Sequence, residues 1–313
     1  MKKIKLIVIV GPTASGKTKL AVQLAKKYHS EVISADSMQI YQKMNIATAK
    51  PTLEEMEGIP HHLIDFLPMN AQFSVSDFVS LARQKIEQLH QSGKLPIIAG
   101  GTGLYINSLV DNVAFSCVEE DPSLRNQLYE QVQQDQGAAL YAYLKQIDPE
   151  SALEIHQNNF VRLVRAVEIY QLTGITMSEH KKNSRLVPSP YEVCMIGLNY
   201  QDREKLYQRI NQRVDIMMEM GLLEEARQIL KEDDLKTAYH AIGYKELKPY
   251  FTGEVSLDEA VDKIKQSSRR YAKRQLTWFR RDKRIHWIYL DKFGSYEEVV
   301  TKSENILENF INL

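Results

Sequence analysis

A glycine-rich motif near the start of the chain constrains its fold more than any other feature. Residues 11–18 have the sequence Gly-Pro-Thr-Ala-Ser-Gly-Lys-Thr and match the phosphate-loop pattern G-x-x-x-x-G-K-[ST]. An apolar run at 3–10 precedes the motif, and apolar residues at helical spacing follow over 17–29, so the motif lies between a predicted strand and a predicted helix. In that setting backbone N–H groups surround phosphate oxygens, a lysine adds a mobile cation, and the last hydroxyl can ligate Mg²⁺. We therefore predict a loop that binds the phosphates of a nucleotide or of another phosphate compound. It consists of Gly11, Pro12, Thr13, Ala14, Ser15, Gly16, Lys17 and Thr18.

Strands and helices alternate on both sides of a central helical segment. Short apolar runs at 31–35 and 95–99 predict further strands, and a helix over 75–91 begins after a capping serine. This alternation is typical of a parallel, doubly wound sheet. Residues 116–190 are rich in Gln, Glu and Asp, have helical periodicity and contain no convincing strand, whereas a strand over 191–198 resumes the α/β pattern. We predict an α/β fold with a P-loop NTPase-like parallel sheet flanked by helices, formed by residues 1–115 and 191–313, and an all-helical insertion domain at 116–190.

The charge of the chain is unevenly distributed. Its 40 basic and 40 acidic side chains cancel, yet the segment from Lys263 to Arg284 contains ten Lys or Arg and one acid. A helix is predicted over 257–280, and basic side chains recur along it at three- and four-residue spacing with no acid between them. Because a solvated helix face normally carries both signs of charge, this stripe favours contact with nucleic-acid phosphates. The stripe consists of Arg270, Lys273, Arg274 and Arg281, with Thr277 between them.

Composition excludes several classes of protein. The chain has 43% hydrophobic and 26% charged residues, as ordinary soluble globular proteins do, and no apolar run approaches the roughly 18 residues of a membrane span. Two cysteines, Cys117 and Cys194, are too few for a disulfide scaffold or a cysteine-based zinc site. We expect a cytoplasmic protein with no membrane association, and no protein partner is evident.

Polar residues follow two of the predicted strands. Asp36 comes after the second, and Gly100-Gly101-Thr102 ends the third, so both lie at the sheet edge where α/β proteins bind ligands. Asp36 is compatible with three roles: holding Mg²⁺ through water, accepting a proton, or capping its own loop. The pairs Arg162/Arg165 and Arg209/Arg213 are by themselves more typical of solvated helix faces. His61-His62 is predicted to lie in a loop, in a structural or surface role.

An ordered series of motifs resembles one family over nearly the whole chain. The blocks are 11–18, 36–41 (Asp-Ser-Met-Gln-Ile-Tyr), 47–51, 60–65, 100–105, 155–156 with Arg162-x-x-Arg165-Ala-x-Glu168, 209–213, 221–222, 241–244 and 272–278. Together they resemble the tRNA dimethylallyltransferases, also called tRNA isopentenyltransferases. Ala47 stands where the family commonly has Gly, and the Cys/His zinc finger of eukaryotic members is absent, which indicates a bacterial-type enzyme.

The resemblance implies transfer of a dimethylallyl group from dimethylallyl diphosphate to N6 of the adenosine 3′-adjacent to the anticodon, in tRNAs reading codons that begin with U. The phosphate loop then holds the diphosphate, with Mg²⁺ at Thr18. Lys17 and Arg213 stabilise the departing charge, Asp36 accepts the proton and Thr102 helps to place the reacting groups. The helical insertion grips the anticodon stem-loop, and the adenine is flipped out of its stack. The residues that the resemblance places on the RNA side are Asp36, Ser37, Met38, Gln39, Thr102, Arg162 and Arg165.

Two other classes share some of these features. A nucleotide or metabolite kinase would use the same phosphate loop with ATP, but it gives no reason for the basic stripe. An RNA-binding GTPase or ATPase without transferase activity would explain the stripe, but the chain has no N-K-x-D motif.

Overall fold

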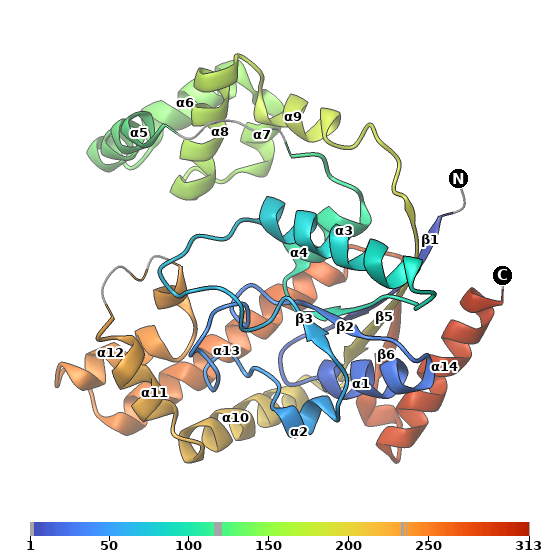
Figure 1. Ribbon diagram of the computed structural model, residues 1–313. Helices are drawn as coiled ribbons and strands as arrows, with labels where there is room; N and C mark the ends of the chain where they lie inside the picture. Colours follow the sequence, from blue (N-terminus) through green and yellow to red (C-terminus); the bar gives the residue numbers. More distant parts are fainter. Residues whose placement is uncertain (1–2, 116–120, 233–234, 236, 313) are drawn as a thin grey trace. The chain divides into compact units, whose positions relative to one another are not determined.

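The computed structural model describes residues 3–115, 121–232, 235 and 237–312 (Figure 1). The chain forms two compact units, one from residues 1–110 and 190–313 and the other from residues 111–189. The first unit contains the sheet and the phosphate loop. The second corresponds to the predicted insertion at 116–190, whose first five residues, with Cys117, lie outside the described part of the chain.

A six-stranded parallel sheet forms the centre of the first unit. Its strands follow the spatial order β3-β2-β4-β1-β5-β6, and every pair is parallel. The prediction of a parallel α/β sheet flanked by helices is confirmed. The bounds are β1 Ile4–Val10, β2 Val32–Ala35, β3 His61–His62, β4 Ile97–Gly100, β5 Tyr191–Asn199 and β6 Ile285–Tyr289.

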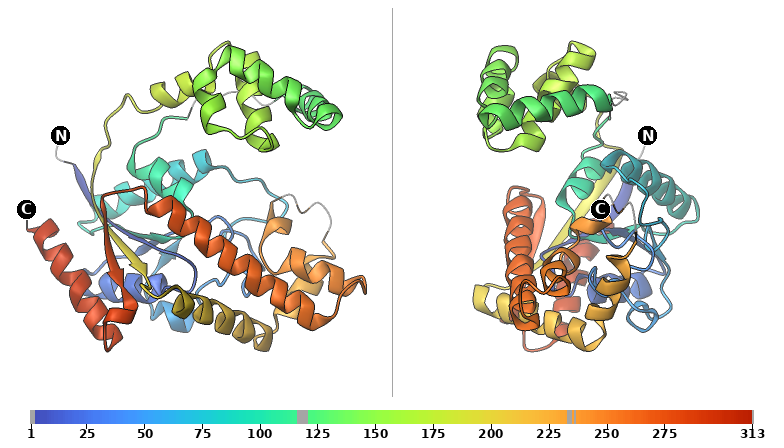
Figure 2. Two further views of the ribbon diagram at one scale, coloured as in Figure 1. Left: turned by 180° about the vertical axis from the view of Figure 1, so that it is seen from behind. Right: turned by 90° about the vertical axis from the view of Figure 1, so that its left-hand side faces the viewer.

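Helices cover both faces of this sheet (Figures 1 and 2), which explains why the central strand β1 is apolar from Leu6 to Val10. Side chains of β1 alternate between the faces: Leu6, Val8 and Val10 pack with helices α3 (Val75–Gln91) and α4 (Gly103–Val110). Ile7 and Ile9 point the other way and pack with α1 (Lys17–Lys27) and α14 (Tyr296–Ile311). Neither α4 nor α14 was predicted from the sequence.

A second layer of helices follows the fifth strand. It consists of α10 (Arg203–Glu219), α11 (Leu222–Ile229), the 3₁₀ turn η1 (Ala238–His240), α12 (Tyr244–Phe251) and α13 (Leu257–Phe279). Their apolar faces enclose the segment after β2, where Tyr41 and Met44 are buried together with Tyr244. The short helix α2 (Leu53–Met56) and the 3₁₀ turn η2 (Leu290–Lys292) complete the unit. Ser256 and Glu259 form a capping box at the start of α13, so this helix begins where the sequence predicts.

The described residues of the second unit form five helices: α5 (Pro122–Asp135), α6 (Ala138–Ile147), α7 (Pro149–Glu154), α8 (Phe160–Thr173) and α9 (Met177–Asn183). Leu128, Leu144, Leu163 and Val167 form its apolar core. Over residues 111–115 and 121–189 it contains no strand.

The prediction that His61-His62 lies in a loop is wrong. These residues form the edge strand β3, which pairs with Val32 and Ile33 of β2. Two residues are too few for a visible alternation of apolar and polar side chains, so only the pairing partner reveals the strand. Among the described helices, none is both long and apolar enough to cross a membrane.

Candidate active site

A cavity of about 590 Å³ opens at the carboxyl ends of β1, β2 and β4. The phosphate loop enters it between β1 and α1, Asp36 enters directly after β2, and Arg213 enters from α10. The structure therefore gathers around one space most of the residues that the sequence predicts for the site. Those lining it are Thr13, Ala14, Ser15, Gly16, Lys17, Thr18, Asp36, Ser37, Met38, Gln39 and Arg213.

The backbone of the phosphate loop requires its two glycines. Gly11 has φ +152°, and a Cβ there would lie 2.4 Å from the carbonyl oxygen of Leu198. Gly16 has φ +80° and precedes α1, where no side chain caps the first N–H groups. Because any larger residue would displace the loop or strain it, the glycines let the N-terminus of α1 open onto the cavity.

Two cations lie beside this loop. Lys17 Nζ donates a hydrogen bond to the carbonyl oxygen of Pro12 at 2.8 Å. Burial, reinforced by the nearby Arg213 and opposed by Asp36, lowers the pKa of Lys17 to about 7. Burial also lowers the pKa of Arg213, although Glu55 and Asp36 counteract the effect. Since burial destabilises both positive charges, an anion that enters the cavity and neutralises them gains binding energy.

Asp36 caps its own loop and keeps one oxygen available. Its Oδ1 accepts hydrogen bonds from the backbone N–H groups of Met38 at 2.9 Å and Gln39 at 3.3 Å. The loop-capping role considered from the sequence is thus present. No described residue donates a hydrogen bond to Oδ2, so the second oxygen can still bind a proton or a water molecule.

Thr102 joins the ends of two strands. Its backbone N–H donates to the carbonyl oxygen of Ala35, and its Oγ1 accepts from the backbone N–H of Ser37 at 3.0 Å. The same hydroxyl donates to Ser37 Oγ at 3.3 Å. Thr102 therefore holds the loop that carries Asp36 against the end of β4.

The inner face of α13 supports the phosphate loop, a role that the sequence did not reveal. Gln275 is 5% exposed; its Oε1 accepts from Thr13 N–H at 2.9 Å, and its Nε2 donates to the Gly101 carbonyl oxygen at 3.0 Å. A Cβ at Gly101 would lie 2.2 Å from Gln275 Nε2, and one at Gly103 would lie 2.2 Å from Trp278 Cδ1. The space that these two glycines leave is filled by side chains of α13.

Gln39, which the resemblance assigns to the RNA side, is engaged within the protein. Its Nε2 donates to the carbonyl oxygens of Thr48 at 3.2 Å and Ala49 at 3.0 Å. Both side-chain amide hydrogens of Gln39 are thus engaged in hydrogen bonds with the loop at 45–50. Contact of Gln39 with RNA stays a prediction.

The basic stripe lies on the exposed side of α13 and just beyond its end. Arg270, Lys273 and Arg274 are exposed on the helix, and Arg281 follows in a turn. None of the four forms an ion pair with a described acid, although the Arg274 guanidinium lies 5.6 Å from the centre of the Tyr271 ring. By contrast, Lys265 on another side of the same helix pairs with Asp215 at 2.6 Å. Four unpaired cations are thus available to an anionic partner.

One arginine of each pair, Arg165 and Arg213, differs from the solvated helix face that the spacing alone suggested, whereas Arg162 and Arg209 are exposed. In the second unit, Glu168 is fully buried and accepts from Arg165 at 2.7 Å and from Arg125 Nε at 2.9 Å, so Arg165 stabilises a buried carboxylate. Arg162 is exposed. In the first unit, Arg213 lines the cavity and donates to Thr13 Oγ1 over a long 3.5 Å.

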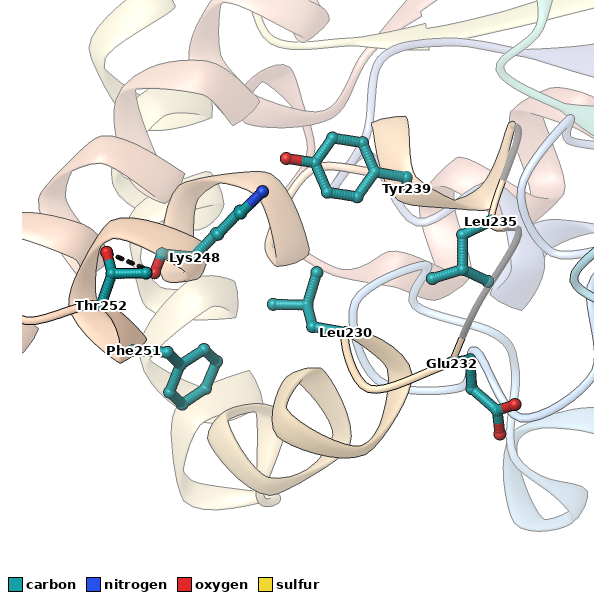
Figure 3. A pocket seen from close by; sticks show the side chains of 7 residues that line it. All are labelled: Leu230, Glu232, Leu235, Tyr239, Lys248, Phe251 and Thr252. Carbon is teal, nitrogen blue, oxygen red and sulfur yellow. Dashed lines mark hydrogen bonds between the residues drawn. The ribbon is translucent and has the colours of Figure 1, made fainter.

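A second cavity, of about 380 Å³, lies among α11, η1 and α12 (Figure 3). Its wall is largely apolar, and Lys248 Nζ lies 5.5 Å from the centre of the Tyr239 ring. It contains none of the predicted site residues. The described residues lining it are Leu230, Glu232, Leu235, Tyr239, Lys248, Phe251 and Thr252.

Comparison with known proteins identifies relatives over the full length of the chain. The model of a family described as IPP transferase matches residues 39–282. A tRNA dimethylallyltransferase of Caldanaerobacter subterraneus subsp. tengcongensis is 48% identical over 308 residues, which cover 97% of both chains. One of Acetivibrio thermocellus is 48% identical over 307 residues, covering 97% of this chain and 98% of the relative.

Solved structures agree with these matches. The crystal structure of a full-length tRNA isopentenylpyrophosphate transferase of Bacillus halodurans is similar with a TM-score of 0.74 and 44% identity, over 98% of this chain and 96% of that one. A eukaryotic dimethylallyltransferase captured acting on tRNA is similar with a TM-score of 0.82 and 30% identity, over 98% of this chain and 80% of that one.

Proposed function

Since this chain belongs to the IPP transferase family, the tRNA dimethylallyltransferases, it transfers a dimethylallyl group to tRNA, and we propose the donor, the acceptor atom and the residues that carry the step. The donor is dimethylallyl diphosphate. The acceptor is N6 of the adenosine 3′-adjacent to the anticodon in tRNAs reading codons that begin with U. A tRNA substrate supports a cytoplasmic location.

The observation that carries this proposal is the pair of half-buried cations, Lys17 and Arg213, beside the phosphate loop. When N6 attacks the allylic carbon, the new C–N bond forms, the C–O bond to the diphosphate breaks, and negative charge grows on the departing oxygen. Lys17, Arg213 and the loop amides surround the place where this charge develops. Groups fixed in advance around a developing charge lower the barrier more than groups that must reorient.

Mg²⁺ fits the same end of the cavity. Thr18 follows Lys17 and lines the cavity at the start of α1, the position from which a phosphate-loop hydroxyl ligates the ion. The described residues contain no group of three His, Cys, Asp or Glu side chains able to hold a metal ion. One hydroxyl suffices, however, because Mg²⁺ typically keeps several waters and takes further oxygens from phosphates. We propose that Thr18 holds the ion, which neutralises diphosphate charge when bound.

Asp36 is the proposed acceptor of the proton that N6 loses. Its Oδ2 has no donor among the described residues, while Oδ1 is fixed by two backbone N–H groups, so the carboxylate is oriented with one oxygen available. Thr102 positions the loop through Ser37. Because an adenine stacked in the anticodon loop cannot reach a cavity at a sheet edge, the base is flipped out of its stack.

The basic stripe and the helical unit are the proposed docking elements for the anticodon stem-loop. Arg270, Lys273, Arg274 and Arg281 are exposed without acidic partners, as phosphate contacts require. On the helical unit, Arg162 is exposed, and Arg165 forms an ion pair with Glu168.

One experiment separates this reaction from a kinase reaction. The protein is incubated with unmodified tRNA and either dimethylallyl diphosphate or ATP. The tRNA is then digested, and the masses of its nucleosides are measured by mass spectrometry. We expect a dimethylallyl group on adenosine with the first donor and no change with the second. A phosphorylated product with ATP and no alkylated adenosine would refute the proposal.

The role of Asp36 is tested by Asp36→Asn, which keeps the shape of the side chain but cannot accept the proton. We expect the single-turnover rate to fall by roughly 10²–10⁴, with diphosphate affinity nearly constant. Asp258→Asn, on the exposed first turn of α13, is the matched control. Recovery of a near wild-type rate in Asp36→Asn by raising Mg²⁺ alone would assign Asp36 to the metal instead.

A further inference from the structure

A single carboxylate on α11 receives four hydrogen bonds from distant parts of the chain. Glu225 Oε2 accepts from the backbone N–H groups of Asn45 at 2.9 Å and Ile46 at 2.8 Å. Its Oε1 accepts from the backbone N–H of Ala47 and from the Tyr244 hydroxyl, each at 2.9 Å. Every one of these contacts is lost if the carboxylate is removed.

Three consecutive amides converging on one point form the type of concavity that binds anions. Here the protein supplies the anion itself, from a helix about 180 residues away in sequence. The loop is also crowded against α12, because a Cβ at Gly243 would lie 3.2 Å from the Cβ of Ala47. The loop at 45–50 thus takes its position from Glu225 and from the helices behind it.

This loop forms one wall of the cavity that contains Asp36. All six residues from 45 to 50 line it. The far end of the loop is held by Gln39, whose Nε2 donates to the carbonyl oxygens of Thr48 and Ala49. The backbone N–H of Gln39 in turn donates to Asp36 Oδ1 at 3.3 Å. A continuous series of contacts therefore runs from Glu225 through the loop and Gln39 to Asp36.

We propose that Glu225 is a positioning residue for dimethylallyl transfer. It holds the loop at 45–50 in place, and the loop, through Gln39, holds the Asp36 carboxylate toward the acceptor. The inference rests on the role proposed above for Asp36. It adds a residue outside the cavity wall, on α11.

The test is Glu225→Gln, which keeps size and shape but, in either orientation of the amide, points N–H donors at one or two of the backbone N–H groups of residues 45–47. We expect single-turnover transfer at saturating tRNA and dimethylallyl diphosphate to fall by roughly 10- to 100-fold, as a displacement of reacting groups by about 1 Å produces. Affinity for pyrophosphate with Mg²⁺ should stay unchanged, because the hydrogen bonds of Glu225 go to the loop at 45–47 and to Tyr244 and none goes to the phosphate loop. Glu224→Gln is the matched control, since its neighbouring carboxylate only approaches Arg227 at 3.6 Å on the surface.

Hydrogen–deuterium exchange gives a readout independent of activity. In Glu225→Gln, exchange should rise in the peptide that contains residues 45–47 and stay unchanged in α3, whereas Glu224→Gln should change neither. Faster exchange at 45–47 with a wild-type transfer rate would overturn the positioning role. Slower transfer with unchanged exchange there would overturn it as well.

A folding defect and a failure of the proposed function can each be distinguished from a failure of the positioning role of Glu225. If backbone amides exchange faster throughout Glu225→Gln, that variant has a folding defect, and Tyr244→Phe is the test instead. Tyr244→Phe removes one of the four hydrogen bonds to Glu225 and keeps the buried ring. That variant should slow transfer roughly three- to tenfold, the equivalent of one hydrogen bond, and an unchanged rate would refute the proposal. If the wild-type protein makes no dimethylallylated adenosine product, the proposed function fails, whatever the exchange at 45–47 shows.

Discussion

Replacing Gln275 by Leu should weaken both the fold and the phosphate loop. The buried amide connects three parts of the chain: α13, the loop at Thr13 and the turn at Gly101. Leu has a similar volume, although it is one bond shorter, and it forms neither hydrogen bond. The substitution therefore removes two polar contacts and creates little empty volume.

The expected loss follows from these two bonds. A hydrogen bond of this kind contributes about 0.5–1.5 kcal/mol net, and a buried polar group left without a partner costs about 1–3 kcal/mol. Thr13 is half-buried and its N–H can regain water, whereas the Gly101 carbonyl lies in a buried turn. We therefore expect the free energy of unfolding to fall by about 2–4 kcal/mol. Because Thr13 N–H loses its anchor, pyrophosphate affinity should also fall, by about tenfold or 1.4 kcal/mol.

Urea unfolding and calorimetric titration with pyrophosphate and Mg²⁺ measure the two effects. Gln266→Leu is the control, because it makes the same change on the same helix at a side chain that forms no hydrogen bond with a described residue. A loss of stability no larger than that of the control, together with unchanged pyrophosphate affinity, would refute the reasoning.

Two further predictions concern the charged groups. Because burial lowers the pKa of Lys17 to about 7 from 10.5, the unfolded chain binds more protons than the folded chain between these pH values. The free energy of unfolding of the wild type, measured relative to Lys17→Met, should therefore rise from pH 7 to pH 10; a constant difference would contradict the buried position of the cation. Each replacement of Arg270, Lys273, Arg274 or Arg281 by Gln should lower the salt slope of tRNA binding by about 0.9. Arg284→Gln, whose guanidinium already pairs with Asp282, is the control, and a quadruple variant with the wild-type slope would show that the stripe does not contact RNA.

Elements with local signals were predictable from the sequence. The strand, the phosphate loop and helix α1 follow one another within the first 27 residues, and each has its own pattern of apolar residues or glycines. Helices α3 and α13 both begin at capping boxes, at Ser74 and Ser256, which satisfy backbone N–H groups through residues three positions away. In each case the interactions that determine the element join residues a few positions apart, so a short stretch of sequence is enough to predict it.

Contacts between distant residues were not predictable in this way. Gln275 reaches Thr13 across 262 positions, Glu225 reaches Ile46 across 179, and the Tyr296 hydroxyl donates to the Gly16 carbonyl oxygen across 280. A single Gln in a basic helix, or one Glu in an acidic pair, has no periodicity that marks its role. Only the packing of α11, α13 and α14 around the sheet brings these side chains to the loops.

Helix α13 combines the two kinds of contact that the reaction needs. Arg270, Lys273 and Arg274 are exposed on it, whereas Tyr271 and Gln275, four residues apart on the same helix, line the cavity. Since residues at three- and four-residue spacing share a helix face, the sequence separates an exposed basic side from a side that supports the phosphate loop. A continuous 23-residue helix fixes the distance between these sides. If the stripe binds RNA phosphates as proposed, α13 would therefore hold them at a set distance from the phosphate loop and Lys17.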